Sequence, residues 1–292
     1  MSKHPTLTEA APAKLNLFLH VLGKLDNGYH DLESLVVFLD LYDWVQLVPS
    51  EAFALSIDGD LAKQLETEGA APKNNLVMKA AQGLAKIASK PLDFGLKLTK
   101  NIPVQAGLGG GSADAAACLR LLCRYWGLDW QDTEVQNLAL QLGADVPVCL
   151  RSKPCLMRGI GEHLTAFDVP ALNLLVTNPM KAVSTKSIFT KLNLTPGTKL
   201  REPLSAQDLV GDPLELIKNT MNDLQATACT LEPAIERSLR LLGQNPNAGV
   251  SRMTGSGATC FAMFGSTDAA ARHTTYLKQH PDQWFWSGST LT

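Results

Sequence analysis

The sequence lacks the features that mark several large classes of protein. It has no run of lysine and arginine, and its formal net charge is −2. Because proteins that bind duplex nucleic acid usually present a basic face, we expect no nucleic-acid partner. No apolar run approaches the roughly 18 residues of a transmembrane helix, and residues 1–14 lack the apolar core of a signal peptide. We therefore expect a cytoplasmic protein with no membrane partner.

The six cysteines form no recognisable metal or redox motif. None belongs to a CxxC pair, and no cysteine–histidine group has the spacing of a zinc site. Most of them have apolar neighbours, which favours small buried side chains in a reducing compartment.

The sequence does contain enough apolar residues for a large core. Of its 292 residues, 45% are hydrophobic and 18% are charged. Chains of this length commonly divide into two domains, and runs of strands followed by grouped helices indicate the α+β class. Glycine and proline punctuate residues 154–168, so we predict a boundary there, between domains 1–165 and 166–292.

The first strand is predicted by alternation of apolar and polar residues over residues 13–22. One face of this strand is apolar, whereas Lys14 and Asn16 both point to the other face. Taken alone, the pattern favours a polar face that is exposed to water. A tight turn is predicted next, at Asp26-Asn27-Gly28.

Further elements follow from the same periodicities, while residues 182–216 show no clear pattern. The predicted strands are 34–39, 44–48, 53–57, 92–98, 172–177 and 259–264. The predicted helices are 75–88, 112–125, 133–142, 221–242 and 268–279, and the fourth of these is interrupted at Glu232-Pro233.

The strongest local signal is the glycine-rich segment Gly107–Ala113, between a predicted strand and an alanine-rich helix. Glycine lets backbone N–H groups approach an anion closely, and the helix adds unpaired N–H groups and the positive end of its dipole. The segment therefore predicts a phosphate-binding loop, with Ser112 at or beside the helix N-cap. It matches neither a Walker A loop nor a dinucleotide fingerprint, and a flexible linker or tight turn is the alternative.

Three weaker signals each leave two interpretations open. Asp145 stands two residues before Pro147, which suits a helix N-cap as well as a functional carboxylate. The Gly255–Ala258 segment fits either a turn or a second close approach to a ligand. The Gly28-Tyr29-His30 segment fits either the tip of a turn or an exposed aromatic platform.

Together these segments resemble the GHMP family of small-molecule kinases. That family is marked by an N-terminal strand motif, a Pro-x-x-x-Gly-Leu-Gly-x-x-Ser loop and a C-terminal glycine-rich motif. This chain has all three in order, at Pro12–Gly23, Pro103–Ala113 and Thr254–Ala258. The resemblance implies an N-terminal ATP-binding domain like ribosomal protein S5 and a C-terminal ferredoxin-like α/β sandwich. It also implies that ATP, with Mg²⁺, phosphorylates an alcohol.

Four segments narrow the resemblance to one branch of the family. In that branch the small-molecule substrate carries a cytidine diphosphate group and belongs to the non-mevalonate route to isoprenoid precursors. The resemblance leaves monomer and homodimer open. The four segments are Pro12–Leu17, Asp26–His30, Leu142–Pro147 and Met253–Ala258.

The resemblance also implies a role for each matching residue. Asp145 matches the catalytic base, and Lys14 matches the catalytic lysine beside it. The residues that match the ATP site are Asn75, Lys100, Pro103, Val104, Gln105, Ala106, Gly107, Leu108, Gly109, Gly110, Gly111, Ser112 and Ala113. The residues that match the acceptor site are Asn16, Tyr29, His30, Thr185 and Phe189, with Tyr29 and Phe189 stacking on the cytosine.

Two residues depart from the family pattern, and two other functions stay open. Gln105 stands where the loop often has a smaller residue, and Gln225 replaces a common glutamate. One alternative is another family member, such as a mevalonate-pathway or homoserine kinase. The other is a nucleotide-binding regulator without turnover, although the presence of both Lys14 and Asp145 argues against it.

Overall fold

The computed structural model describes residues 7–63, 75–280 and 282–292, so residues 1–6 of the predicted N-terminal domain lie outside it. The chain forms two compact units, each assembled from separate stretches of sequence, and the predicted division after residue 165 stays a prediction. Unit 1 comprises residues up to Lys14, Leu41–Val104 and Gly109–Ser152. Unit 2 comprises Leu15–Asp40, Gln105–Leu108 and Lys153–Thr292.

Two long strands, β1 (Leu7–Lys24) and β2 (His30–Val48), pair with each other, and each contributes residues to both units. The sequence predicts a shorter first strand and two separate strands in place of β2. The polar residues Asp40 and Asp43 interrupt the apolar pattern of β2 but do not end the strand. Backbone hydrogen bonds define a strand, and they do not depend on the polarity of its side chains.

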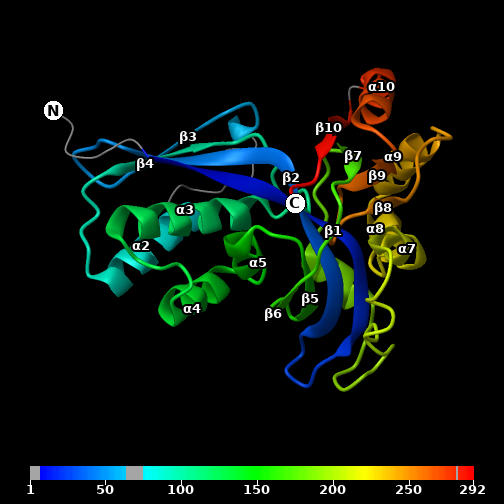
Figure 1. Ribbon diagram of the computed structural model, residues 1–292, viewed down its shortest axis with the longest axis horizontal. Helices are drawn as coiled ribbons and strands as arrows, with labels where there is room; N and C mark the ends of the chain where they lie inside the picture. The colour runs from blue at the N-terminus through cyan, green and yellow to red at the C-terminus, as the bar shows by residue number, and fades with distance from the viewer. Residues whose placement is uncertain (1–6, 64–74, 281) are drawn as a thin grey trace. The chain divides into compact units, whose positions relative to one another are not determined.

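In unit 1, β4 (Gly95–Thr99) pairs antiparallel with the end of β2 and parallel with β3 (Leu55–Asp58). Among the described residues of unit 1, four helices accompany these strands, and the longest of them, α3, contacts the other three (Figure 1). The helices are α2 (Leu76–Ala88), α3 (Gly110–Trp126), α4 (Thr133–Leu142) and α5 (Val146–Arg151).

Three aromatic residues of unit 1 surround one fully buried side chain, Phe94. Its ring lies edge-on to Phe53 and Tyr125, at centroid distances of 6.0 and 5.6 Å, and close to Trp126 at 6.2 Å. Edge-to-face contacts of this kind are favoured by the ring quadrupole. They join the segments that flank β3 and β4 to the end of α3, and so fix the far end of that helix.

In unit 2, β5 (Cys155–Gly159) pairs with β2 and forms a hairpin with β6 (His163–Ala166). The sequence predicts no strand here and indicates a domain boundary in this stretch, because glycine and proline punctuate it. The structure shows that these glycines build the turn instead. Gly159 and Gly161 both have positive φ values, which allow the chain to reverse.

A second sheet in unit 2 has the strand order β10-β7-β9-β8 and is antiparallel throughout. Its strands are β7 (Asn173–Asn178), β8 (Ser251–Met253), β9 (Cys260–Phe264) and β10 (Trp284–Ser289). The helices of this unit are α6 (Thr185–Lys191), α7 (Pro213–Asn219), α8 (Gln225–Leu231), α9 (Ala234–Gly243) and α10 (Thr267–Leu277).

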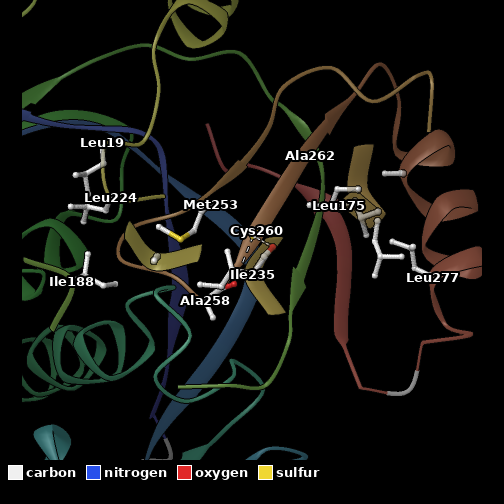
Figure 2. Close-up of a cluster of buried hydrophobic side chains, with 14 of the residues drawn as sticks. Leu19, Leu175, Ile188, Leu224, Ile235, Met253, Ala258, Cys260, Ala262 and Leu277 are labelled. Carbon is white, nitrogen blue, oxygen red and sulfur yellow. Dashed lines mark hydrogen bonds between the residues drawn. The ribbon is translucent and has the colours of Figure 1, made fainter. Parts of the chain in front are cut away.

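The helix predicted over residues 221–242, with an interruption at Glu232-Pro233, is divided at that point into α8 and α9. The break falls at Pro233, because proline has no N–H to continue the helical hydrogen bonds. Figure 2 shows the core that these helices cover, in which Leu224, Ile235 and Met253 pack with residues of β1 and β9. Mixed sheets and grouped helices confirm the α+β prediction. Within the described residues, no helix is both long and apolar enough to cross a bilayer.

Candidate functional site

The two residues that match the catalytic positions are adjacent in unit 1. Lys14 extends from β1, and its Nζ lies 3.1 Å from Oδ2 of Asp145. The side chain of Lys14 is 5% exposed and that of Asp145 is 36% exposed, so the lysine is buried and the carboxylate is accessible to solvent. The arrangement presents a cation and a carboxylate oxygen together.

The prediction of a water-exposed polar face on the first strand is wrong. Lys14 is 4% exposed and Asn16 is 1% exposed, although their alternation with apolar residues is as predicted. Period two determines which side chains share a face, but it does not show what covers that face. A buried lysine needs a compensating charge, which Asp145 supplies.

Asp145 occupies the position before α5, where the sequence allows an N-cap. Its side chain makes no capping hydrogen bond. The carboxylate is directed to Lys14 instead, so the structure favours the functional interpretation over the cap.

The unit 1 part of the glycine-rich loop lies against Lys14. Gly109 has φ +65° and is the N-cap of α3, and a Cβ at this glycine would lie 3.2 Å from Cβ and Cε of Lys14. Glycine is therefore needed both for the backbone conformation and for the close approach. Helix α3 begins earlier than predicted, so Ser112 lies within its first turn rather than at the cap.

The beginning of α3 offers backbone donors, as the sequence predicts. Its first intrahelical hydrogen bond runs from the N–H of Ala113 to the carbonyl of Gly109. The N–H groups of Gly110, Gly111 and Ser112 precede that bond and lie at the positive end of the helix dipole. This geometry suits an anion such as a phosphate.

Lys100, which matches a position near ATP, is 3% exposed and is held by two buried carboxylates of unit 1. Its Nζ donates to Asp43 and, at 2.7 Å, to Asp114. Asp43 also accepts hydrogen bonds from the N–H groups of Asn101 and Ile102, which directly precede the loop. Asp114 lies in α3, just after the loop. This triad joins the two ends of the glycine-rich loop.

Burial and charge act in opposite directions on the members of this triad. Burial alone would lower the pKa of Lys100, but the two carboxylates raise it above its ordinary value. Burial raises the pKa of Asp114 to about 8, despite the attraction of Lys100 and with a further contribution from Asp43. The triad therefore carries an additional proton near neutral pH.

Asn75 caps α2 with its side chain. Its Oδ1 accepts a 2.8 Å hydrogen bond from the N–H of Val77. The cap uses the carbonyl oxygen of the amide, which leaves the amide nitrogen as the group that suits a contact with a nucleotide.

In unit 2, Asn16 is fixed by two neighbouring segments. Its N–H donates to Oγ1 of Thr254 at 2.7 Å, and its side-chain amide donates to Oγ of Ser34 at 2.7 Å. A Cβ at Gly255 would lie 3.3 Å from Oδ1 of Asn16. Thus the N-terminal strand motif and the C-terminal glycine motif are in contact.

Thr185, at the start of α6, contacts the same glycine motif. Its hydroxyl lies 2.7 Å from the hydroxyl of Ser256, and both groups are at the surface. Among the acceptor residues, Asn16 and Thr185 are therefore both linked to the segment Thr254–Ser256.

The two aromatic positions of the predicted acceptor site differ in their surroundings. The ring of Phe189 lies 4.6 Å from the ring of His30, whereas Tyr29 is 62% exposed. Nε2 of His30 is buried and has no hydrogen-bond partner among the described residues. Burial, and then the charge of Lys24, lowers the pKa of His30.

The middle of the glycine-rich loop, Gln105–Leu108, belongs to unit 2. Gly107 has φ +77°, and a Cβ there would lie 2.6 Å from the carbonyl oxygen of Gly257. Gln105 has φ +52°, which is a left-handed backbone conformation that residues other than glycine adopt at some energetic cost. Of the remaining residues of the predicted ATP site, Pro103, Ala106 and Leu108 are buried and Val104 is partly buried.

Sequence patterns missed several residues that shape these regions. Asp114 had a usable signal, since it is the only charged residue in the apolar segment 113–119. Asp43 and Asn222 had none, because each acts through partners that are distant in the sequence. Among the described residues, no group of three or more His, Cys, Asp or Glu side chains is placed to hold a metal ion.

Two family models match the chain in order. The model described as GHMP kinases N terminal domain matches residues 75–153, and the model described as GHMP kinases C terminal matches residues 201–282. The first match contains α2 to α5 with the glycine-rich loop, and the second contains α7 to α10.

Curated relatives match almost the whole chain. A 4-diphosphocytidyl-2-C-methyl-D-erythritol kinase of Rhodospirillum rubrum is 42% identical over 290 residues, covering 98% of this chain and 93% of the relative. A protein of the same name from Rhizobium etli is 41% identical over 283 residues, covering 96% of this chain and 93% of that one.

Solved structures share the fold. A crystal structure of 4-(cytidine 5'-diphospho)-2C-methyl-D-erythritol kinase has a TM-score of 0.77 at 27% identity and covers 98% of this chain and 100% of its own. A crystal structure of a homoserine kinase from Cytophaga hutchinsonii has a TM-score of 0.71 at 18% identity and covers 100% of this chain and 96% of its own. This second similarity concerns the fold alone.

Proposed function

The chain belongs to the GHMP kinase family, and from that premise we propose that it transfers the γ-phosphoryl group of ATP to the 2-hydroxyl of 4-diphosphocytidyl-2-C-methyl-D-erythritol. The family expected from the three sequence motifs is confirmed. The proposed reaction is a step of the non-mevalonate route to isoprenoid precursors.

The single observation that carries the proposal is the 3.1 Å contact of Lys14 with Asp145 beside the glycine-rich loop. Phosphoryl transfer makes little covalent demand on a protein, and catalysis consists of positioning the reactants and compensating negative charge. A carboxylate, an ammonium group and a row of backbone donors are the groups that this chemistry requires.

In the proposed mechanism, Asp145 accepts the proton of the acceptor hydroxyl while it orients that oxygen toward the γ-phosphorus. Lys14 stabilises the negative charge that spreads over the transferring oxygens. General-base assistance of this kind contributes about 10²- to 10⁴-fold to the rate. The partly exposed carboxylate of Asp145 is open to a substrate, whereas the ammonium group is fixed by burial.

The N–H groups at the start of α3 bind the phosphates of ATP in this proposal. Backbone N–H groups bind phosphate and do not ligate a cation, so a Mg²⁺ would arrive bound to ATP, and it would neutralise phosphate charge there. Lys100 acts indirectly: because its Nζ is bound to Asp43 and Asp114, we assign it to holding the loop rather than to contacting the nucleotide.

Recognition of the acceptor rests on unit 2. Tyr29 and Phe189 stack on the cytosine, and each stacked base contributes about 1–3 kcal/mol. The buried Nε2 of His30 needs a hydrogen-bond partner, and a polar edge of the base would satisfy it. Asn16 and Thr185 contact the rest of the acceptor.

The test is a coupled assay of ADP release with Mg·ATP and four separate acceptors: the proposed substrate, mevalonate, homoserine and galactose. We expect turnover with the cytidine substrate alone, and loss of that turnover in Asp145→Asn. Turnover with another of these alcohols would support kinase activity but contradict the proposed cytidine-binding site. ATP binding without transfer to any acceptor would instead support the regulator.

A further inference from the structure

A short turn in unit 2, Thr254–Gly257, contacts two of the proposed acceptor residues. We call it the Gly255 turn. Its Thr254 hydroxyl accepts the N–H of Asn16, and its Ser256 hydroxyl is hydrogen-bonded to Thr185, each at 2.7 Å. The turn closes with a hydrogen bond from the N–H of Gly257 to the carbonyl of Thr254 at 3.0 Å. Any displacement of this turn therefore changes the positions of both acceptor residues.

One buried side chain holds the Gly255 turn in place. Asn222 is 6% exposed, and its Nδ2 donates two 2.8 Å hydrogen bonds, to the carbonyls of Met253 and Gly255. Its Oδ1 accepts the N–H of Leu224 at 2.9 Å. Both amide hydrogens are thus used on the backbone of the turn and the residue before it.

The backbone around Asn222 is itself fixed to β1. The N–H of Leu19 donates to the carbonyl of Met221, and the N–H of Asp223 donates to the carbonyl of Leu19. The side chain of Asp223 accepts the N–H of Val21 at 2.8 Å. Since Asn16 also lies on β1, Asn222 sets the distance between this strand and the turn that contacts it.

We propose that Asn222 is a positioning residue for the acceptor, acting through the Gly255 turn on Asn16 and Thr185. This inference rests on the proposed function, because it takes those two residues as acceptor contacts. The glycine-rich loop also touches the Gly255 turn, since a Cβ at Gly107 would lie 2.6 Å from the carbonyl oxygen of Gly257. The loop has a second attachment that does not involve Asn222, from the N–H of Thr259 to the carbonyl of Ala106, so we expect the phosphate side to depend on Asn222 less.

A neighbouring amide provides a matched comparison. Gln225 accepts the N–H of Met253 through its Oε1 at 2.9 Å, so it serves this segment as an acceptor, whereas Asn222 serves it as a donor. Exchange of an amide for a carboxylate removes donors and keeps acceptors. The same chemical change should therefore remove the hydrogen bonds of residue 222 to this segment and keep that of residue 225. It also explains how glutamine and glutamate can both suit position 225.

The experiment measures initial rates for wild type, Asn222→Asp, Gln225→Glu and Ser256→Ala, varying the acceptor at saturating Mg·ATP and then ATP at saturating acceptor. For Asn222→Asp we expect the KM for the acceptor to rise about tenfold or more, because two buried carbonyls lose their donors. The KM for ATP should change less than about threefold, and Gln225→Glu should remain within about twofold of wild type for both substrates.

Three results would overturn the inference. The first is an equal rise of the KM for the acceptor and the KM for ATP in Asn222→Asp. The second is no rise of either KM in that variant. The third is a Gln225→Glu variant that shows the same rise in the KM for the acceptor as Asn222→Asp. If Asn222→Asp does not fold, as judged by circular dichroism, Ser256→Ala decides the question. This change removes one partly exposed hydroxyl, and an unchanged KM for the acceptor would show that the turn does not act through Thr185.

The design separates this inference from the proposed function. A wild-type protein that does not phosphorylate the cytidine substrate would refute the proposed function before any variant is compared. Normal wild-type turnover with an unchanged Asn222→Asp would refute only the positioning role.

Discussion

The ammonium nitrogen of Lys14 lies 3.1 Å from a carboxylate oxygen of Asp145, although the two residues are 131 positions apart in the chain. The first prediction follows from this contact. Asp145→Asn keeps the shape of the side chain but removes the base, so kcat should fall about 10²- to 10⁴-fold. The dissociation constant for ATP should change little, because the loop is proposed to hold the phosphates.

Asp132→Asn is the matched control for this prediction. Asp132 also stands before a short helix of unit 1 without making a side-chain cap, but it is not paired with Lys14. Steady-state kinetics and a nucleotide titration of both variants provide the measurement. A near-normal kcat in Asp145→Asn, or an equal loss in both variants, would contradict the assignment of the base.

The exposed ring of Tyr29 leads to the second prediction. Tyr29→Ala should raise the KM for the cytidine substrate about 5- to 100-fold, the range that corresponds to the loss of one stacked base. The KM for ATP should be unaffected. Tyr29→Phe keeps the ring and should resemble wild type. Equal changes in both KM values would place Tyr29 outside the acceptor site.

The third prediction concerns the pH dependence of acceptor binding. Burial and Lys24 lower the pKa of His30, so this imidazole remains neutral at pH values where an ordinary histidine begins to protonate. The KM for the acceptor should therefore be constant from pH 8 down to about pH 6.5 and rise only below that value. In His30→Gln, which cannot protonate, the rise should disappear. Acceptor titrations across this range would contradict the prediction if both proteins behaved alike.

The fourth prediction concerns stability, through the buried carboxyl of Asp114. Its pKa of about 8 lies far above the ordinary aspartate value of 3.8, so folding takes up a proton between these two pH values. The free energy of unfolding contributed by this group therefore falls as pH rises through that window and is constant above it.

Asp114→Asn removes this dependence. The difference in Tm between the variant and wild type should therefore shift in favour of the variant as the pH rises from 5 to 9. The shift should be about 2–4 °C for each kcal/mol of unfolding free energy that wild type loses through Asp114. Asp58→Asn is the contrasting control, since hydrogen bonds from Lys97 and Thr99 lower the pKa of Asp58. Its contribution is present at high pH and is lost on acidification. Parallel pH profiles for wild type and Asp114→Asn, measured by thermal unfolding, would refute the prediction.

Local sequence patterns predicted the elements whose signals are local. Helix α4 has the predicted bounds, and α2 begins one residue after its predicted start at Asn75, because helical periodicity depends on near neighbours. The hairpin of β5 and β6 was missed, since its glycines suit a linker as well as a turn. The uninterrupted β2 was missed because polar residues break the side-chain pattern without breaking backbone pairing.

The sequence by itself determined the family, because the chemistry of phosphate binding requires glycine, serine and a helix start at fixed local spacing. Only the tertiary structure decided what surrounds the matching residues. Lys100 contacts two carboxylates instead of facing solvent, and Asn222 holds a turn that begins about 30 residues later. Partners of this kind are distant along the chain, and side-chain periodicity indicates a face of an element without indicating what packs on it.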